Sequence, residues 1–105
     1  MIVEILSFAG CPNDGYAREI VEQVLQELGL EPKILTVDVP DLETAQRVGF
    51  LGSPTIRVDG RDVEPGADER HDFTLACRLF RTDQGYRGQP DAHWVRAALL
   101  EAADG

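Results

Sequence analysis

The longest regular pattern in the chain is a helical spacing of apolar residues between positions 13 and 28. The apolar positions follow the i, i+3, i+4, i+7 series that places side chains on one face of a helix. These positions are Ala17, Ile20, Val21, Val24, Leu25 and Leu28. Gly29 then supplies the left-handed residue that commonly ends a helix. The pattern predicts an amphipathic helix that begins near Asn13 and ends before Gly29.

Four segments have the pattern of β-strands. Residues 1–8 form an apolar run, and residues 32–39 are β-branched and apolar. Residues 55–58 and 61–64 alternate on either side of Asp59-Gly60, a pair typical of a two-residue hairpin turn. We therefore expect two strands joined by the helix, followed by an antiparallel hairpin.

A short helix is predicted between the second strand and the hairpin. Asp41 can cap its first turn, and Gly49 can end it. Its inward face would consist of Leu42, Ala45 and Val48, which share the helical spacing.

A last helix is predicted after Pro90, which suits a first helical position. Its apolar face would consist of Trp94, Val95, Ala98, Leu99 and Ala102. The resulting order β-α-β-α-β-β-α predicts an α/β sandwich with a mixed four-stranded sheet. With 105 residues, of which 43% are hydrophobic, residues 1–105 are expected to form a single domain.

Charge and composition narrow the possible partners. The formal net charge is −9, and no run of basic residues offsets it, so nucleic acid and anionic membrane surfaces are not expected partners. No apolar stretch approaches the roughly 20 residues of a membrane span, and no signal-peptide pattern opens the sequence. We therefore expect a soluble, cytoplasmic protein whose two cysteines rest as free thiols.

Cys11 lies where the first strand gives way to the first helix. The unpaired N–H groups and the dipole of a helix N-terminus favour an anion, and the thiolate is the reactive form of cysteine. The negative charge of Asp14 would repel a thiolate at Cys11, but the attraction from the helix dipole is expected to be slightly larger than this repulsion. We expect Cys11 to be exposed and reactive.

Residues 65–89 form a connection far longer than the usual 4 to 6 residues. This segment contains Cys77, and we expect it to fold over the Cys11 end of the helix and present Cys77 as a distal partner. The alternative is that Cys77 is buried as a small hydrophobic residue. Arg78 and Arg81 either solvate the segment or favour a nearby thiolate or anionic substrate.

Three motifs in this order resemble the thioredoxin-like superfamily. They are Phe8-Ala9-Gly10-Cys11-Pro12 between strand and helix, Gly52-Ser53-Pro54-Thr55 before the third strand, and the Asp59-Gly60 hairpin. The resemblance implies a thioredoxin-like sandwich in which Pro54 is cis and lies beside Cys11. It also implies that Pro12, Ser53 and Pro54 contact the substrate, with the backbone of Ser53 docking an extended chain.

The sequence departs from that family in the run Cys11-Pro12-Asn13-Asp14, where a carboxylate replaces the second cysteine. We therefore expect thiol-disulfide exchange in which Cys11 attacks a disulfide and Cys77 is the candidate resolving thiol. The substrate would be a small-molecule or protein thiol or disulfide. No cofactor is expected.

Two alternatives remain open. The set Cys11, Asp14 and Cys77 resembles organomercurial lyases, in which two thiolates bind mercury and a carboxylate handles the proton. A non-catalytic binding module with the same fold would need no reactive thiol. A resident metal is not expected, because the cysteines and histidines lack the short spacing of structural zinc sites.

Overall fold

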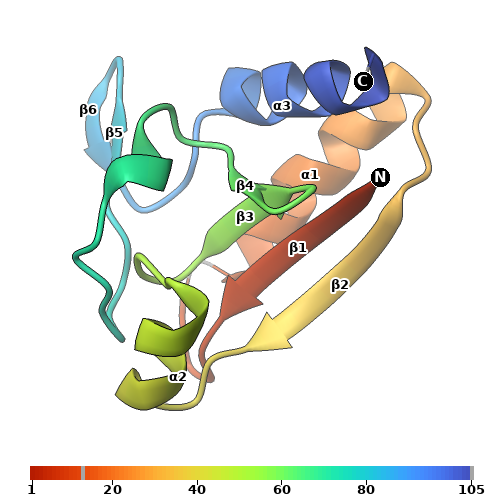
Figure 1. Ribbon diagram of the computed structural model, residues 1–105. Coiled ribbons are helices and arrows are strands. Elements are labelled where there is room, and N and C mark those ends of the chain that lie inside the picture. The colour runs from red at the N-terminus through yellow and green to blue at the C-terminus, as the bar shows by residue number, and fades with distance from the viewer. Residues whose placement is uncertain (13, 105) are drawn as a thin grey trace.

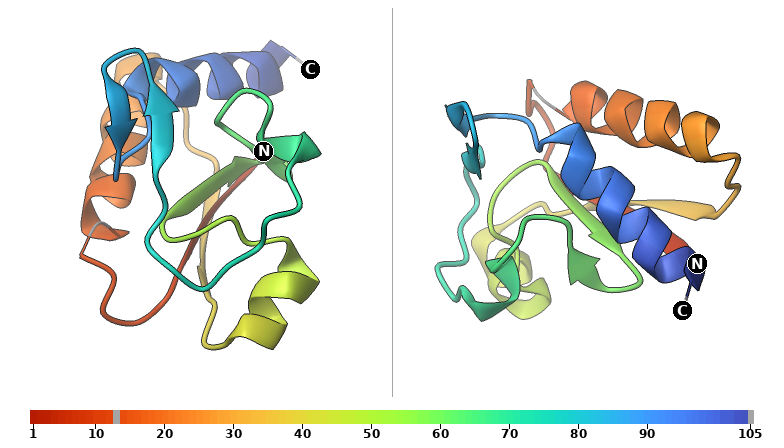
Figure 2. Two further views of the ribbon diagram at one scale, coloured as in Figure 1. Left: turned by 90° about the vertical axis from the view of Figure 1, so that its left-hand side faces the viewer. Right: turned by 90° about the horizontal axis from the view of Figure 1, so that it is seen from above.

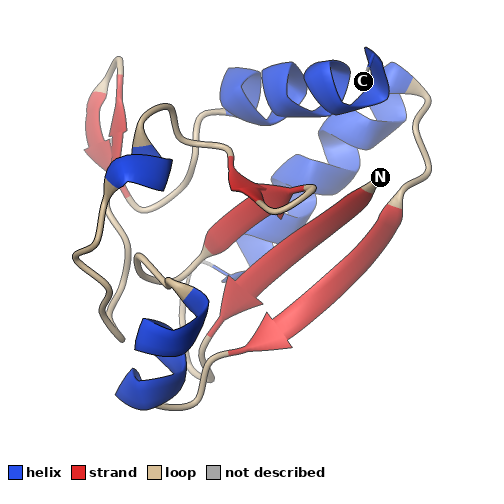
Figure 3. Ribbon diagram, viewed as in Figure 1, coloured by secondary structure: helices blue, strands red, loops and turns tan. Residues whose placement is uncertain are grey.

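The computed structural model describes residues 1–12 and 14–104, and its elements lie close to the segments that the sequence predicts (Figure 1). The elements of the first half are β1 (Ile2–Ser7), α1 (Asp14–Leu28), β2 (Lys33–Asp38) and α2 (Leu42–Val48). Those of the second half are β3 (Thr55–Val58), β4 (Arg61–Asp62), the 3-10 helix η1 (Ala67–Glu69), β5 (Phe80–Thr82), β6 (Gly85–Arg87) and α3 (Ala92–Asp104). The predicted α/β class is confirmed, but the connection expected as a long loop before α3 contains η1 and a separate two-stranded antiparallel sheet of β5 and β6 (Figure 3).

The main sheet has four strands in the order β2-β1-β3-β4. Strand β1 runs parallel to β2 and antiparallel to β3, and β3 runs antiparallel to β4. Helix α1 provides the crossover that a parallel pair requires. Asp59 and Gly60 have φ values of 49° and 85°, which suit the two central positions of a tight hairpin turn. The mixed four-stranded sheet is therefore confirmed.

Helices α1 and α3 cover one face of the sheet, and α2 lies against the other (Figure 2). Side chains of β1 alternate between these faces: Val3 and Ile5 pack with α1 and α3, whereas Leu6 packs with α2. No helix in the described part of the chain is long and apolar enough to cross a membrane.

Helix α2 begins and ends close to where the sequence predicts, but only part of its predicted inner face is buried. The Asp41 side chain accepts a hydrogen bond from the Thr44 N–H at 2.7 Å, and Gly49 ends the helix in the left-handed conformation. Ala45 is buried, but Leu42 is 50% exposed. The prediction for Leu42 is wrong because the apolar cluster that receives Ala45 does not extend to the first turn of the helix.

Replacement of Leu99 by Ala tests how α3 packs. Leu99 is fully buried in the cluster between α1, α3 and the sheet, so its truncation should lower the free energy of unfolding by about 2–5 kcal/mol. Leu100→Ala is the matched control, because Leu100 is 45% exposed and should change it by about 0.5 kcal/mol or less. Urea unfolding followed by circular dichroism measures both, and equal losses would contradict this packing.

Candidate functional site

Cys11 lies between β1 and α1 as the sequence predicts, but its side chain is buried. The residue is 5% exposed and its thiol is free. The Cys11 N–H donates to the Phe8 carbonyl at 3.2 Å, and Gly10 has a φ of 87°, as in a turn that needs a left-handed residue at its third position. The expected exposure of Cys11 is wrong because this tight turn folds the thiol against the protein.

The other residues around Cys11 are described in part. Pro12 is exposed. Helix α1 begins at Asp14, but the Asp14 side chain lies outside the described part of the chain. The predicted influence of Asp14 on Cys11, and with it the lyase alternative, therefore stays a prediction.

Residues 76–78, which we call the strap, run beside Ser53. The Ser53 N–H donates to the Ala76 carbonyl at 2.8 Å, and the Arg78 N–H donates to the Ser53 carbonyl at 2.9 Å. These bonds form a parallel bridge between Ser53 and Cys77. The Ser53-Pro54 peptide bond is cis, as expected. The strap thus uses the backbone groups of Ser53 for which we expected a docked substrate.

Gly52 allows this close approach. Its φ is 118°, and a Cβ atom added here would lie 2.9 Å from the Arg78 Cα and 3.1 Å from the Ala76 carbonyl oxygen. Side chains other than hydrogen are therefore excluded at this position unless the strap moves.

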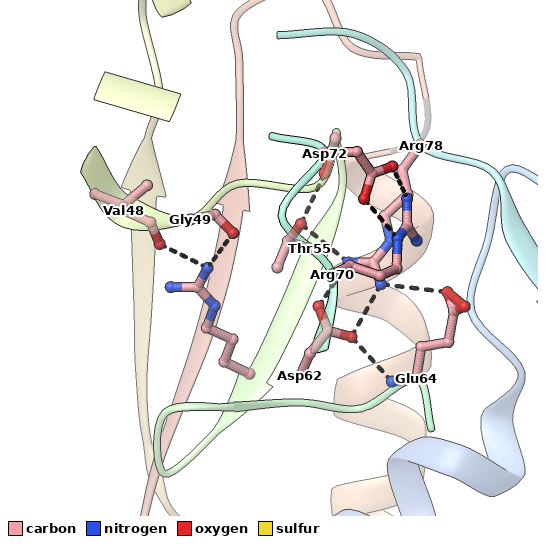
Figure 4. A network of polar contacts seen from close by, with 10 residues as sticks. Val48, Gly49, Thr55, Asp62, Glu64, Arg70, Asp72 and Arg78 are labelled. Carbon is pink, nitrogen blue, oxygen red and sulfur yellow. Dashed lines mark hydrogen bonds and ion pairs between the residues drawn. The ribbon is translucent and has the colours of Figure 1, made fainter. Parts of the chain in front are cut away.

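The side chain of Arg78, the last residue of the strap, holds the strap to Asp62 of β4 and to Glu64 in the turn that follows (Figure 4). Arg78 is only 1% exposed. Its guanidinium donates to both carboxylate oxygens of Asp62 at 2.7 and 3.0 Å and to Glu64 at 3.2 Å. It also donates to the Thr55 hydroxyl at 3.2 Å and lies 4.3 Å from the centre of the Phe80 ring. The expectation that Arg78 solvates the segment is wrong, because two carboxylates that follow the β3–β4 turn draw it inward.

Cys77 is an exposed, free thiol. Successive side chains of an extended segment point to opposite sides, so the burial of Arg78 turns Cys77 outward. The alternative of a buried Cys77 is therefore wrong. Both cysteines are unpaired, and no disulfide joins them in this structure.

A groove of about 510 Å³ lies beside Cys77. Its lining includes Leu51, Thr74, Leu79, Arg70, Arg81 and Tyr86, together with Glu64, whose carboxylate is paired with Arg78. The charge of Arg70 is offset by Asp72, whereas Arg81 is exposed and forms no ion pair with any described residue. The exposed thiol therefore shares its groove with a cation that is not neutralised.

A contact that the sequence analysis missed involves Arg57 of β3. Its guanidinium donates to the Val48 and Gly49 carbonyls at 2.8 and 3.0 Å, at the end of α2 (Figure 4). Carbonyls at a helix end lack partners within the helix. No local sequence signal links a strand arginine to a helix end, because the contact depends on how the two elements cross.

Asp83, Asp91 and His93 form the one group of described residues whose ligand atoms could hold a cation, within 4.8 Å of one another. Asp91 accepts from the His93 N–H at 3.2 Å and lies 2.8 Å from its ring nitrogen. Burial raises the pKa of Asp91, but the hydrogen bonds from His93 outweigh it and leave that pKa below its ordinary value. These contacts make Asp91 a cap for the first turn of α3.

The predicted site residues fall at one end of the sheet. Leu6 pairs with Thr55, so the loop that carries Cys11 follows β1 where Ser53 and Pro54 precede β3. The strap joins Cys77 to Ser53 there.

No protein-family model, curated protein or solved structure matches the chain.

Substitution of Gly52 by Ala tests the strap. Because the added Cβ would overlap Arg78, the variant should lose about 2 kcal/mol or more of unfolding free energy. Hydrogen exchange of the Ser53 and Arg78 amides should also become faster. Gly66→Ala is the matched control, since Gly66 has a φ of 82° and open space around it; its cost should be about 1 kcal/mol, without faster exchange at these two amides. Equal exchange in both variants would contradict the close approach.

The titration of Asp72, which is paired with Arg70, tests the structure of the segment before the strap. Hydrogen bonds from Arg70 lower the pKa of Asp72 to about 2 from an ordinary 3.8. A lowered pKa in the folded state contributes stability above the ordinary value that is lost as the pH falls toward 2.

NMR titration of the Asp72 carboxyl should therefore give a midpoint near 2, and Arg70→Gln should return it toward 3.8. Arg87→Gln is the control and should leave the midpoint in place. A midpoint that does not respond to Arg70→Gln would show that another group sets it.

Proposed function

We propose that the chain is a thioredoxin-like thiol protein that exchanges disulfides through Cys77 and Cys11. The observation that carries this proposal is the bridge between Cys77 and Ser53, which holds a free thiol beside the residues that precede β3. The order of strands and helices and the antiparallel β3–β4 pair at the sheet edge support the thioredoxin-like sandwich.

The difference in solvent exposure between the two cysteines favours a particular order of steps. The exposed Cys77 thiolate attacks one sulfur of a substrate disulfide, the substrate S–S bond breaks, and one substrate thiolate leaves. The product is a mixed disulfide on Cys77. This order reverses the one that the sequence suggested, because Cys11 is 5% exposed whereas Cys77 is open to solvent.

Cys11 acts in the second step. Its thiolate attacks the Cys77 sulfur of the mixed disulfide, a Cys11–Cys77 disulfide forms, and the second substrate thiolate leaves. The substrate gains two electrons, the protein loses two, and the protons of the two protein thiols pass to the released substrate thiolates. The step requires the Cys11 loop and the strap to approach until the sulfurs reach bonding distance, about 2 Å.

The groove beside Cys77 supports an anionic disulfide of low mass as the substrate. Arg81 provides a cation in this groove that no described carboxylate neutralises. An opposite charge near a reacting thiol raises the local concentration of an ionic substrate, and salt weakens the effect.

Three disulfides of similar size and different charge test the proposal. Reduced protein is mixed with dithiodiglycolate, bis(2-hydroxyethyl) disulfide or cystamine, and the release of substrate thiol is followed. The anionic disulfide should react fastest, although the net charge of −9 would favour the cation. Arg81→Gln should slow the anionic reaction by about 3-fold, whereas Arg47→Gln, with the same charge change on α2, should not.

Cysteine variants and mass spectrometry test the order of steps. Cys77→Ser should abolish substrate thiol release, and Cys11→Ser should stop at protein that carries half of the substrate. The wild type should instead form the internal disulfide and lose the mass of two hydrogen atoms. Retained activity in Cys77→Ser, or a wild type that accumulates only the mixed disulfide, would overturn the proposed exchange.

A further inference from the structure

A second groove lies on the other side of the turn at residues 64–66, between the β3–β4 hairpin and helix α3. Its volume is about 420 Å³, within the range of sites for small molecules. Its apolar lining includes Val58, Val63, Pro65, Trp94, Ala98 and Ala102. Neither cysteine lines it, so it is a separate feature from the candidate thiol site.

The rim of this groove is acidic. Asp59 lies at the hairpin turn, Asp68 in η1 and Glu101 in α3, so the three carboxylates come from three separate elements. Asp62 and Glu64 also line the groove, but their charges are held by the buried Arg78. Of the outer three, Asp59 accepts a hydrogen bond from the Ile2 N–H at 2.8 Å, which leaves Asp68 and Glu101 as the carboxylates that a cationic ligand would contact.

Arg61 shows which chemical group this rim accepts. Its guanidinium lies between two elements, 3.5 Å from an oxygen of Asp68 and 3.7 Å from an oxygen of Glu101. The Arg61 side chain is 72% exposed and both separations are long. Each ion pair therefore contributes little to stability, and a ligand can displace the Arg61 guanidinium.

We propose that this groove binds a small amphipathic cation. An aromatic or alkyl body would lie on the apolar floor, and an ammonium or guanidinium would take the place of the Arg61 guanidinium between Asp68 and Glu101. The half-buried indole of Trp94 adds an aromatic surface that attracts cations as well as apolar groups. This inference is independent of the proposed thiol exchange.

Trp94 also provides the measurement, because it is the one tryptophan of the chain. Its fluorescence is followed during titration with phenethylamine, with the uncharged phenethyl alcohol and with the anionic 3-phenylpropionate. The amine should give a saturable change that weakens at high salt, and the alcohol should bind about 10-fold more weakly. The anion should give no saturable change.

Charge variants locate the site. Asp68→Asn and Glu101→Gln should each weaken phenethylamine binding by about 2–5-fold, and Arg61→Gln should strengthen it by a similar factor. Glu43→Gln is the control, since Glu43 is an exposed acid on α2, and it should have no effect.

Three results would overturn the proposal: equal binding of the amine and the alcohol, no fluorescence response to the amine, or a loss in Glu43→Gln as large as that in Glu101→Gln. The last would show that the amine responds only to the overall negative charge.

Discussion

The long segment between β4 and α3 depends on one buried cation. Arg78 has a fully buried side chain, and the side chains of its partners Asp62 and Glu64 are 6% and 10% exposed. Removing such charges from water costs several kcal/mol for each ion, and the cost is offset only when the geometry is good and the hydrogen bonds are satisfied. Two contacts to Asp62 and one each to Glu64 and Thr55 satisfy the two terminal nitrogens of the guanidinium, whereas its buried Nε has no partner among the described residues. Because loss of one partner would leave a buried charge, the position of the strap is coupled to β4 and to the turn that follows it.

This pairing also determines the charge of the surface on either side of residues 64–66. Asp62 and Glu64 face inward to Arg78, so the groove beside Cys77 retains the unneutralised Arg81, whereas Asp68 and Glu101 make the other groove acidic. The net charge of −9 therefore does not describe each site. It disfavours polyanions such as nucleic acids, whose binding needs many cations together, but it leaves room for a small anion next to one arginine.

Local signals in the sequence were sufficient for most of the fold. The apolar series that gives α1 and the Asp59-Gly60 turn each depend on neighbours within a few residues, and both were predicted correctly. The strap was not predictable in this way. Arg78 finds its partners 14 and 16 residues away, and a charged residue in a polar segment has the same sequence pattern whether it is solvated or buried in a pair. The burial of Cys11 likewise depends on the direction of a turn, which the thiol and its helix do not determine.

The strap also affects which substrates suit the proposed exchange. An extended peptide that docks on Ser53 would have to replace two backbone hydrogen bonds made by the strap, each worth about 1 kcal/mol net. It would also have to move a segment anchored by the buried Arg78 pair, and disruption of such a pair costs about 3–5 kcal/mol. A small disulfide that reaches the exposed Cys77 from solvent needs neither change to form the mixed disulfide, and only the later attack of Cys11 requires the strap to move. The energetic difference therefore favours small disulfides over extended peptides, with the strap serving as the carrier of the reactive thiol rather than as a cover to be displaced.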